Sequence, residues 1–149
     1  MFVDDHQMLI DGMKALLRNE SQFEIAGEAT RCKKALELIP RINPDIIVTD
    51  IHMPEMTGIE FASVIHKKYP HIKMLALSMY GEKGMISEML NAGVSGYILK
   101  NTGKRELVSA LQKIQDGGLF FSDEIFTEMM KNIAEKKQGS SEKKRANLT

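Results

Sequence analysis

The sequence predicts an α/β fold, in which one doubly wound, five-stranded parallel sheet is covered by helices on both faces. Short runs of apolar and β-branched residues alternate along the chain with stretches whose apolar residues recur at helical spacing. This alternation is typical of parallel strands joined by crossover helices. With 149 residues, the chain is long enough to bury one such core but too short for two ordinary domains.

The first half of the chain contains three strand signals. Met1–Val3 is a short apolar run, and an apolar helical stripe follows it. Phe23 and Ile25 alternate with polar neighbours, which predicts the second strand. Pro40 and Pro44 are expected to help close the next helix, because proline interrupts helical hydrogen bonding. Ile46–Thr49 is almost continuously apolar, as in a strand that is buried on both faces.

The second half of the chain repeats the same pattern. A helix over about residues 59–65 leads to the fourth strand, Met74–Leu77. A helix over roughly 83–91 stops at Gly93, since glycine commonly ends helices. The fifth strand, Gly96–Leu99, is followed by a helix whose apolar face carries Leu107, Leu111 and Ile114.

Composition and charge exclude several classes of protein. The formal net charge is zero, so the whole chain has no electrostatic footprint for nucleic acid or an anionic membrane. The sequence contains no leader and no apolar run of membrane-spanning length, and its one cysteine, Cys32, cannot form an internal disulfide. The four histidines lack the paired spacing of metal ligands, so no zinc or haem site is expected. We expect a cytoplasmic protein with Cys32 packed as a small hydrophobic residue.

Polar side chains stand at or just beyond the carboxyl ends of four predicted strands. Asp4 and Asp5 follow the first strand and Asp50 follows the third. Ser78 ends the fourth strand and Lys100 follows the fifth. Open parallel sheets bind ligands in the crevice beyond these ends, so folding should bring the five side chains together. Clustered carboxylates repel one another, and a bound hard cation relieves that repulsion, with Mg²⁺ fitting best beside phosphate.

This arrangement predicts the transfer of a phosphoryl group to a carboxylate. Carboxylates can attack phosphorus to form an acyl phosphate, while a metal ion neutralises the charge on the transferring oxygens. Asp5 and Asp50 would bind Mg²⁺ directly and Asp4 would act through water. Lys100 and Ser78 would hold the remaining phosphoryl oxygens. Taken singly, each residue has an ordinary structural explanation, as a turn aspartate, a capping serine or a surface lysine.

The order of these residues resembles the receiver domains of bacterial response regulators, the phosphoacceptor modules of two-component signalling. The similarity spans nearly all of residues 1–118 and includes Asp50 within Thr-Asp-Ile-His-Met-Pro. The resemblance implies a flavodoxin-like fold with strand order 2-1-3-4-5. It also implies phosphorylation of Asp50 by a sensor histidine kinase.

The resemblance assigns a role to each site residue. Asp4, Asp5, Asp50 and the main-chain carbonyl of His52 would form the Mg²⁺ site. Asp50 would accept the phosphoryl group, which would then be contacted by Ser78 and Lys100. On this basis the chain is not an enzyme, apart from self-catalysed phosphoryl transfer and autodephosphorylation.

The resemblance extends to a conformational switch. Phosphorylation adds roughly two negative charges, which would draw Ser78 inward and let Tyr97 rotate into the space. The alternative for Tyr97 is an aromatic residue on an edge strand, half covering the sheet. Residues 91–100 and 117–122 are similar to the NarL/FixJ subfamily, whose members usually end in a LuxR-type helix-turn-helix domain.

Residues 119–149 are expected to form a linker helix and a flexible tail leading to a helix-turn-helix domain that is missing from this chain. Ser122 or Asp123 could cap the helix, and the composition then turns to lysine, serine, glutamate and glutamine. DNA would be contacted only through the missing domain, in control of transcription. Similar receivers often self-associate, so a homodimer favoured by phosphorylation is also expected.

Two other functions stay open. One is a stand-alone, receiver-like interaction module that is never phosphorylated. The other is a magnesium-dependent phosphohydrolase with an aspartate nucleophile, although Ile51 and His52 follow Asp50 and a second acid, needed as the general acid, is missing there.

The predicted first strand departs from the family pattern. Family members normally carry several more apolar residues before the pair of aspartates, whereas only Met1–Val3 precedes it here. A central strand this short loses burial and ladder hydrogen bonds. It would need compensating contacts, a partner strand or a lower stability, unless the start of the sequence is misassigned.

Overall fold

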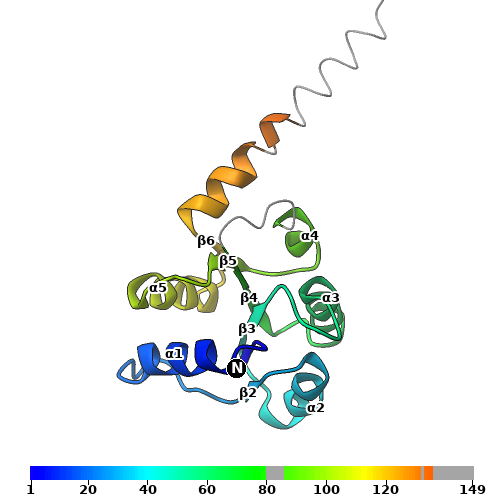
Figure 1. The fold of residues 1–149 in the computed structure, drawn as a ribbon, viewed down its shortest axis with the longest axis vertical. Coiled ribbons are helices and arrows are strands. Elements are labelled where there is room, and N and C mark those ends of the chain that lie inside the picture. The colour runs from blue at the N-terminus through cyan, green and yellow to red at the C-terminus, as the bar shows by residue number, and fades with distance from the viewer. Residues whose placement is uncertain (80–85, 132, 136–149) are drawn as a thin grey trace, which may run out of the picture.

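The protein is seen in a computed structural model that describes residues 1–79, 86–131 and 133–135. Within those residues a sheet of six parallel strands has the order β2-β1-β3-β4-β5-β6 (Figure 1). The strands are β1 (Phe2–Val3), β2 (Glu28–Ala29), β3 (Ile46–Asp50), β4 (Lys73–Ser78), β5 (Gly96–Leu99) and β6 (Phe120–Phe121). The helices are α1 (Gln7–Leu17), α2 (Cys32–Ile42), α3 (Gly58–Lys68), α4 (Ile86–Asn91) and α5 (Lys104–Gln115).

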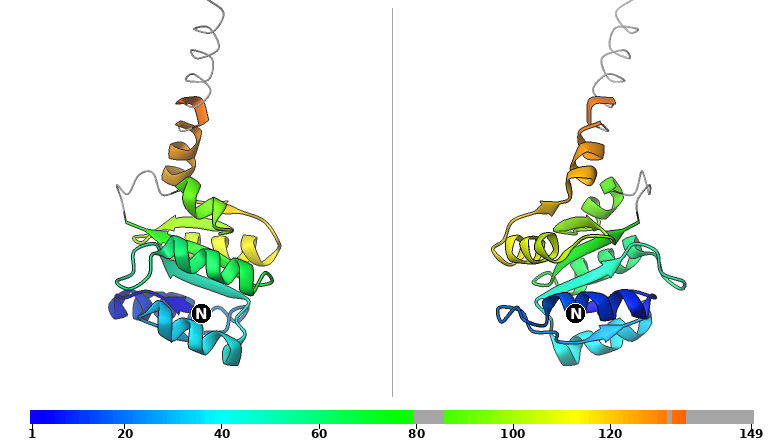
Figure 2. Two further views of the ribbon diagram at one scale, coloured as in Figure 1. Left: turned by 90° about the vertical axis from the view of Figure 1, so that its right-hand side faces the viewer. Right: turned by 60° about the vertical axis from the view of Figure 1, so that its left-hand side comes forward.

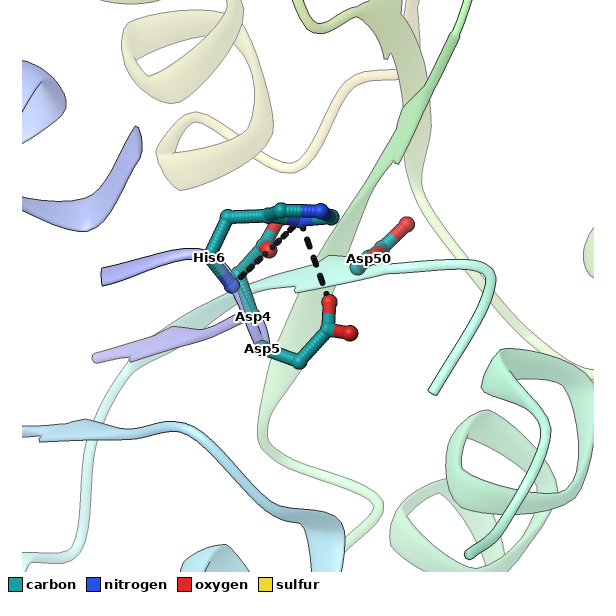
Figure 3. A group of neighbouring side chains, drawn as sticks. All are labelled: Asp4, Asp5, His6 and Asp50. Atoms are coloured by element: carbon teal, nitrogen blue, oxygen red, sulfur yellow. Dashed lines mark hydrogen bonds and ion pairs between the residues drawn. The ribbon is translucent and has the colours of Figure 1, made fainter. Parts of the chain in front are cut away.

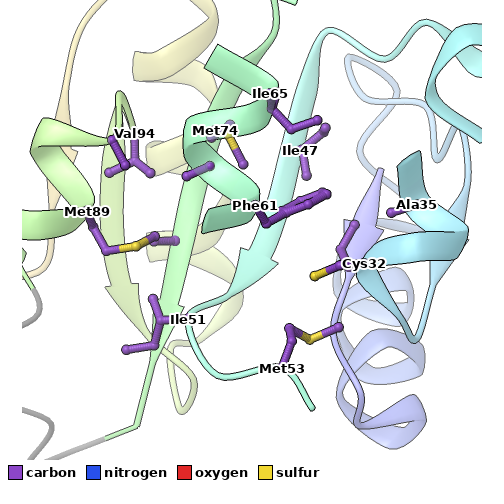
Figure 4. Close-up of a cluster of buried hydrophobic side chains, with 14 of the residues drawn as sticks. Cys32, Ala35, Ile47, Ile51, Met53, Phe61, Ile65, Met74, Met89 and Val94 are labelled. Atoms are coloured by element: carbon purple, nitrogen blue, oxygen red, sulfur yellow. The ribbon is translucent and has the colours of Figure 1, made fainter. Parts of the chain in front are cut away.

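Helices cover both faces of the sheet, with α1 and α5 on one face and α2, α3 and α4 on the other (Figure 1, Figure 2). Neighbouring residues of β3 serve different cores, because side chains alternate along a strand. Ile47 packs with the helices of the α2–α4 face, where Figure 4 shows Phe61 and Ile65 of α3 over the sheet. Val48 packs with α1 and α5. The predicted α/β class and doubly wound arrangement are confirmed.

The sheet has one strand more than predicted. β6 pairs with β5 through two hydrogen bonds, from Phe120 N–H to the Ser95 carbonyl and from Ser122 N–H to the Tyr97 carbonyl, each 3.1 Å long. Two adjacent phenylalanines favour a strand, and β5 would otherwise present an open edge. Because β6 covers that edge, β5 is an inner strand and Tyr97 is fully buried, so the alternative that Tyr97 is an aromatic residue on an edge strand is wrong.

The second strand lies later in the chain than predicted. β2 is Glu28–Ala29, not the segment around Phe23 and Ile25. Its partner explains the shift, since Phe2 pairs with Glu28 and Val3 pairs with Ala29. β1 itself has two residues, so residues 23–26 have no length of β1 beside them.

Helix α2 runs past Pro40 to Ile42, so of the two prolines predicted to help close it, only Pro44 lies beyond its end. Pro40 lies in the last turn, where it removes only one helical hydrogen bond. Asn43 ends the helix with a left-handed backbone (φ 50°) and donates its N–H to the Ile39 carbonyl at 2.7 Å. Cys32 begins the helix and is 2% exposed, which confirms its packing as a small hydrophobic residue.

A further helical segment follows β6 and extends away from the sheet (Figure 1). Ile125 anchors its start in the core of the α2–α4 face, whereas Phe126 is 51% exposed. The division of the chain at residue 118 stays a prediction, and residues 136–149 lie outside the described part, as does the predicted start of the fourth helix near residue 83. Among the helices described, none has the length and apolar character needed to cross a membrane.

Candidate functional site

The carboxyl ends of β1, β3, β4 and β5 lie at one edge of the sheet, which we call the carboxyl edge. The register aligns Val3 of β1 with Thr49 of β3, one residue before Asp4 and Asp50 respectively. On the other side of β3, Ser78 of β4 is aligned with Leu99 of β5, and Lys100 follows. The parallel pairing therefore brings these strand ends together from distant parts of the sequence.

Three aspartates gather at this edge (Figure 3). Asp4 and Asp50 are each 2% exposed, while the side chain of Asp5 is 32% exposed. One oxygen from each of the three carboxylates and one ring nitrogen of His6 all lie within 4.8 Å of one another. The structure thus brings together all three acids predicted for the metal site.

The loop after Asp50 is held in place by a close backbone approach. Gly58, the first residue of α3, donates its N–H to the Ile51 carbonyl at 2.9 Å. A side chain at Gly58 would place its Cβ 2.5 Å from the Ile51 Cα, so glycine is required for this contact. Thr57 caps the same helix by accepting a hydrogen bond from Glu60 N–H at 3.1 Å. The capped helix therefore fixes the backbone beside Asp50.

The ammonium of Lys100 bridges two of the buried carboxylates. Its Nζ lies 3.0 Å from Asp50 Oδ2 and 3.4 Å from Asp4 Oδ2, and its side chain is 13% exposed. Burial works against the charged form, yet the hydrogen bonds and charges of Asp50 and Asp4 hold the pKa of Lys100 above its usual value. Lys100 therefore supplies the positive charge that compensates this pair.

The environment of Asp50 disfavours its negative charge. Burial raises the pKa of Asp50 above its ordinary value, and the nearby charge of Asp4 acts in the same direction. The His52 N–H, which donates to Asp50 Oδ1 at 3.1 Å, and the Lys100 ammonium only partly offset this effect. The positive charge of Lys100 thus compensates the charge of the Asp50 carboxylate only in part.

Ser78 and Tyr97 lie on neighbouring strands beside this group. Ser78 is fully buried, and its carbonyl accepts the Lys100 N–H at 2.7 Å, while its hydroxyl donates to the Met79 carbonyl at 3.0 Å. Tyr97 is buried in the same core as Ile86 of α4. The role of Ser78 at the phosphoryl group, the switch role of Tyr97 and the metal contact of the His52 carbonyl stay predictions.

His6 belongs to the group, although its spacing from the other histidines gave no sign of a metal site. Its Nδ1 lies 2.9 Å from Asp4 Oδ1, 3.1 Å from Asp5 Oδ1 and 3.4 Å from Lys100 Nζ. Its backbone N–H also donates to Asp4 Oδ1 at 2.8 Å. The signal in the sequence is its position directly after two acids at a strand end, which places the imidazole where the loop turns back.

The residues at this edge fit a hard divalent cation. Asp4 Oδ2 and Asp50 Oδ2 are buried and receive no well-aligned hydrogen bond from the described residues, beyond their charge contacts with Lys100. Carboxylate oxygens are the ligands that Mg²⁺ prefers. A cation here would relieve the repulsion between the acids and the desolvation of Asp50.

The sequence matches a family model described as the response regulator receiver domain, over residues 1–112. Relatives include the transcriptional regulatory protein DegU of Brevibacillus brevis, 32% identical over 95% of this chain and 62% of its own length. The transcriptional regulatory protein MctR of Rhizobium johnstonii is 33% identical over 87% of this chain and 61% of its own length. The response regulator protein VraR of Staphylococcus aureus is 36% identical over 91% of this chain and 66% of its own length. The chain thus spans less than two thirds of each relative.

Solved structures show the same fold. A LuxR-family two-component response regulator from Aurantimonas superposes with a TM-score of 0.83, at 28% identity over 90% of this chain and 96% of its own. The receiver domain of a putative response regulator NarL from Mycobacterium tuberculosis superposes with a TM-score of 0.73, at 28% identity over 78% of this chain and 94% of its own. The isolated receiver domain of RcsB from Salmonella enterica superposes with a TM-score of 0.78 over 85% of this chain and 94% of its own. Its sequence is 22% identical, so this likeness shows the fold alone.

Proposed function

Because the chain belongs to the response regulator receiver family, we propose that it accepts a phosphoryl group on Asp50 from a sensor histidine kinase. The observation that carries this proposal is the position of the Asp50 carboxylate, whose Oδ2 lies 3.0 Å from Lys100 Nζ. The same carboxylate belongs to one group with Asp4 and Asp5. A nucleophilic carboxylate thus stands between a cation-binding group of acids and a fixed ammonium.

The chemistry follows from these neighbours. An Asp50 oxygen forms a bond to phosphorus, and the bond between phosphorus and the kinase histidine nitrogen breaks. Mg²⁺ held by Asp4, Asp5, Asp50 and the His52 carbonyl would neutralise charge on the phosphoryl oxygens. Lys100 faces Asp50 and would pair with a phosphoryl oxygen. Ser78 would donate its hydroxyl to another oxygen, and the chain would catalyse only its own phosphorylation and dephosphorylation.

The transfer would also change the electrostatics of Asp50. The buried carboxylate, whose pKa is raised by burial, becomes a neutral acyl group. The new charge would lie on the phosphoryl oxygens, which could pair with Lys100 and with a cation held by the acids. Phosphorylation would therefore replace a negative charge on the buried carboxylate with charge on phosphoryl oxygens that positive groups can neutralise.

The switch would act through Ser78 and Tyr97. Movement of the Ser78 hydroxyl toward the phosphoryl group would remove its bond to the Met79 carbonyl. Tyr97 packs in one core with Ile86 and Met89 of α4. Any rotation of its ring would repack the surface around α4, which gives the switch a route to a partner.

The output would be the control of transcription through a LuxR-type DNA-binding domain outside this sequence. Relatives such as DegU are transcriptional regulatory proteins, and the chain covers only part of their length. Residues 1–118 would be the receiver and residues 119–149 the linker to that domain, with signalling in the cytoplasm. Phosphorylation would favour a homodimer, which size-exclusion chromatography with and without beryllium fluoride would detect as a change in apparent mass.

Beryllium fluoride, which mimics a phosphoryl group on aspartate, tests the proposal without a kinase. Mg²⁺ and beryllium fluoride together should shift the amide resonances of His52, Ser78 and Lys100 in the wild-type chain. The Asp50→Asn variant, which keeps the shape of the side chain, should not respond. If the wild-type chain fails to respond, the unphosphorylated interaction module is favoured, and a response that persists in Asp50→Asn would show that another residue is the acceptor. Rapid multiple turnover of phosphate esters would instead favour the phosphohydrolase.

A further inference from the structure

The helical segment after β6 carries an apolar side that stays exposed. Residues 123–131 and 133–135 are helical, and the segment extends beyond the sheet and its covering helices (Figure 1, Figure 2). Phe126, Met130 and Ile133 are 51%, 45% and 47% exposed. They follow one another at spacings of four and three residues, so their side chains lie on one side of the helix. We call these three side chains the outer stripe.

The same helix packs on the receiver core through a different side. Ile125 is 5% exposed in the core of the α2–α4 face, and Met129 packs against that core. With 3.6 residues per turn, Ile125 and Phe126 point about 100° apart. Apolar side chains therefore occupy two sides of the helix, and the described part of the chain covers only one of them.

The outer stripe is a cluster and not a chance scatter of exposed residues. Among the described residues, six large hydrophobic side chains are exposed, and three of them form the stripe. The other three, Met8, Met79 and Leu119, belong to separate segments. Scattered apolar residues are normal on a protein surface, whereas adjacent ones mark a surface that another molecule covers.

The charges along this segment divide it into two halves of opposite sign. Asp123, Glu124 and Glu128 precede Met130, the middle residue of the stripe, and no lysine or arginine accompanies them. Residues 131–137, of which 132, 136 and 137 count here by sequence alone, contain three lysines and one glutamate. Two such helices lying antiparallel bring opposite charges together, and their helix dipoles favour the same arrangement. Parallel helices would bring like charges together.

We propose that the outer stripe binds the outer stripe of a second copy of this chain, with the two helices antiparallel and Met130 near the two-fold axis. Phe126 of one copy then faces the Ile133 end of the other copy's stripe. Apolar side chains meet on both sides of the axis, and the acidic half of each helix lies beside the basic half of the other. This pairing is a property of the helix and does not depend on the phosphorylation of Asp50.

A second copy fits the outer stripe better than an unrelated partner, because the helix is complementary to itself. A two-fold axis at the middle of the stripe matches the apolar side chains and both charged halves at once. A purely acidic or purely basic partner would match only one half. The three half-exposed side chains of each copy bury much less than the roughly 1,200 Å² of a stable interface. The dimer is therefore weak, with a Kd on the order of 100 µM.

Sedimentation equilibrium of the full, unphosphorylated chain tests the pairing. The wild type should pass from monomer to dimer between about 10 µM and about 1 mM. Met130→Glu places two like charges at the axis and should raise the Kd of the dimer at least about tenfold. Two matched controls should keep the wild-type Kd: Met8→Glu, at an 88% exposed methionine of α1, and Thr127→Glu, on the same helix outside the stripe. A wild type that stays monomeric throughout this range, or equal Kd values for Met130→Glu and the controls, would overturn the proposal.

Disulfide crosslinking tests the antiparallel arrangement. Chains that carry Phe126→Cys or Ile133→Cys are oxidised separately and as a mixture at the same total concentration. The mixture should give at least about fivefold more linked dimer than either chain alone, because a disulfide forms only between closely facing positions. Cys32 is 2% exposed and burial raises its pKa to about 11, so it does not compete. Dominant linkage of Phe126→Cys to itself would mean parallel helices and would overturn the arrangement, while leaving the proposal for Asp50 untouched.

Discussion

The two edges of the sheet, at the carboxyl and the amino ends of its strands, differ in how closely they are packed. At the carboxyl edge, Lys100 pairs with two buried acids and the loop after Asp50 is held by Gly58. At the amino edge, residues 22–26 and the start of β3 line a cavity of about 370 Å³. Both edges include β1, because Asp4 and Asp5 follow it at the carboxyl edge, while Met1 and Phe2 line the cavity at the amino edge. The positions of Asp4 and Asp5 are thus linked, through one short strand, to the cavity at the amino edge.

The largest expected difference between the edges lies in two adjacent residues of β3. Ile47 is fully buried, whereas Ile46 is partly exposed beside the cavity at the amino edge. Ile47→Ala should lower the free energy of unfolding by about 4 kcal/mol, and Ile46→Ala by about 1 kcal/mol, because only the first leaves a new cavity in a packed core. Urea denaturation measures both values. Equal losses would show that the amino edge is packed as tightly as the rest of the sheet.

The next largest effect should come from removing the ammonium at the carboxyl edge. Lys100→Met leaves Asp4 and Asp50 without their shared positive charge and should lower the free energy of unfolding by about 3 kcal/mol. Lys104→Met is the matched control, since it breaks an ion pair with Glu20 (3.1 Å) whose lysine side chain is 47% exposed and should cost less than about 1 kcal/mol. Added Mg²⁺ should restore part of the loss only in Lys100→Met. Similar losses in the two variants would refute the bridging role.

A smaller change of opposite sign is expected for Asp50→Asn. The pKa of Asp50 is higher in the folded chain than its ordinary value of 3.8, so the folded state binds a proton more tightly than the unfolded state. Stability therefore falls as the pH rises through the window above 3.8. Asparagine cannot ionise, so Asp50→Asn should be more stable than the wild type by about 1 kcal/mol at neutral pH.

The pH dependence provides the check on Asp50→Asn. Thermal melts of both chains between acidic and neutral pH should show an advantage of the variant that shrinks as the pH falls toward 3.8, the ordinary pKa of the carboxyl, and that is absent below it. An advantage of the wild type at neutral pH would mean that the Asp50 charge is stabilising in the folded chain.

The smallest effect is expected for His6. Its imidazole contacts the carboxylates of Asp4 and Asp5 that would bind Mg²⁺, so a cation must replace these contacts. His6→Ala should therefore tighten the Kd for Mg²⁺ by about two- to fivefold, a change of no more than about 1 kcal/mol. His66→Ala, on α3, is a control that should leave the Kd unchanged. Isothermal titration calorimetry distinguishes the two, and weaker binding in His6→Ala would indicate that the imidazole supports the cation.

The acidic site could be predicted from the sequence because it depends on strand ends that strong local patterns mark. The apolar run 46–49 leads directly to Asp50, and parallel pairing then brings Asp4 and Lys100 to the same edge. Features that depend on partners far along the chain could not be read in this way. The position of β2 is set by how little of β1 lies beside Phe23 and Ile25, and a local alternation pattern does not contain that information.

Two further differences have the same physical origin. Phe120 and Phe121 form a strand because β5 offers an open edge, which is a property of the assembled sheet. His6 joins the acids because the loop after β1 turns its ring back over Asp4, a geometry that residue spacing does not reveal.

Phosphorylation with acetyl phosphate in the presence of Mg²⁺ tests the central claim most directly. Intact mass spectrometry of the wild-type chain should show the mass increment of one phosphoryl group, and peptide mapping should place it on Asp50. Asp50→Asn should show none, while Lys104→Met should be labelled like the wild type. A wild-type chain that stays unlabelled, or an Asp50→Asn variant that is labelled equally, would contradict Asp50 as the phosphoacceptor.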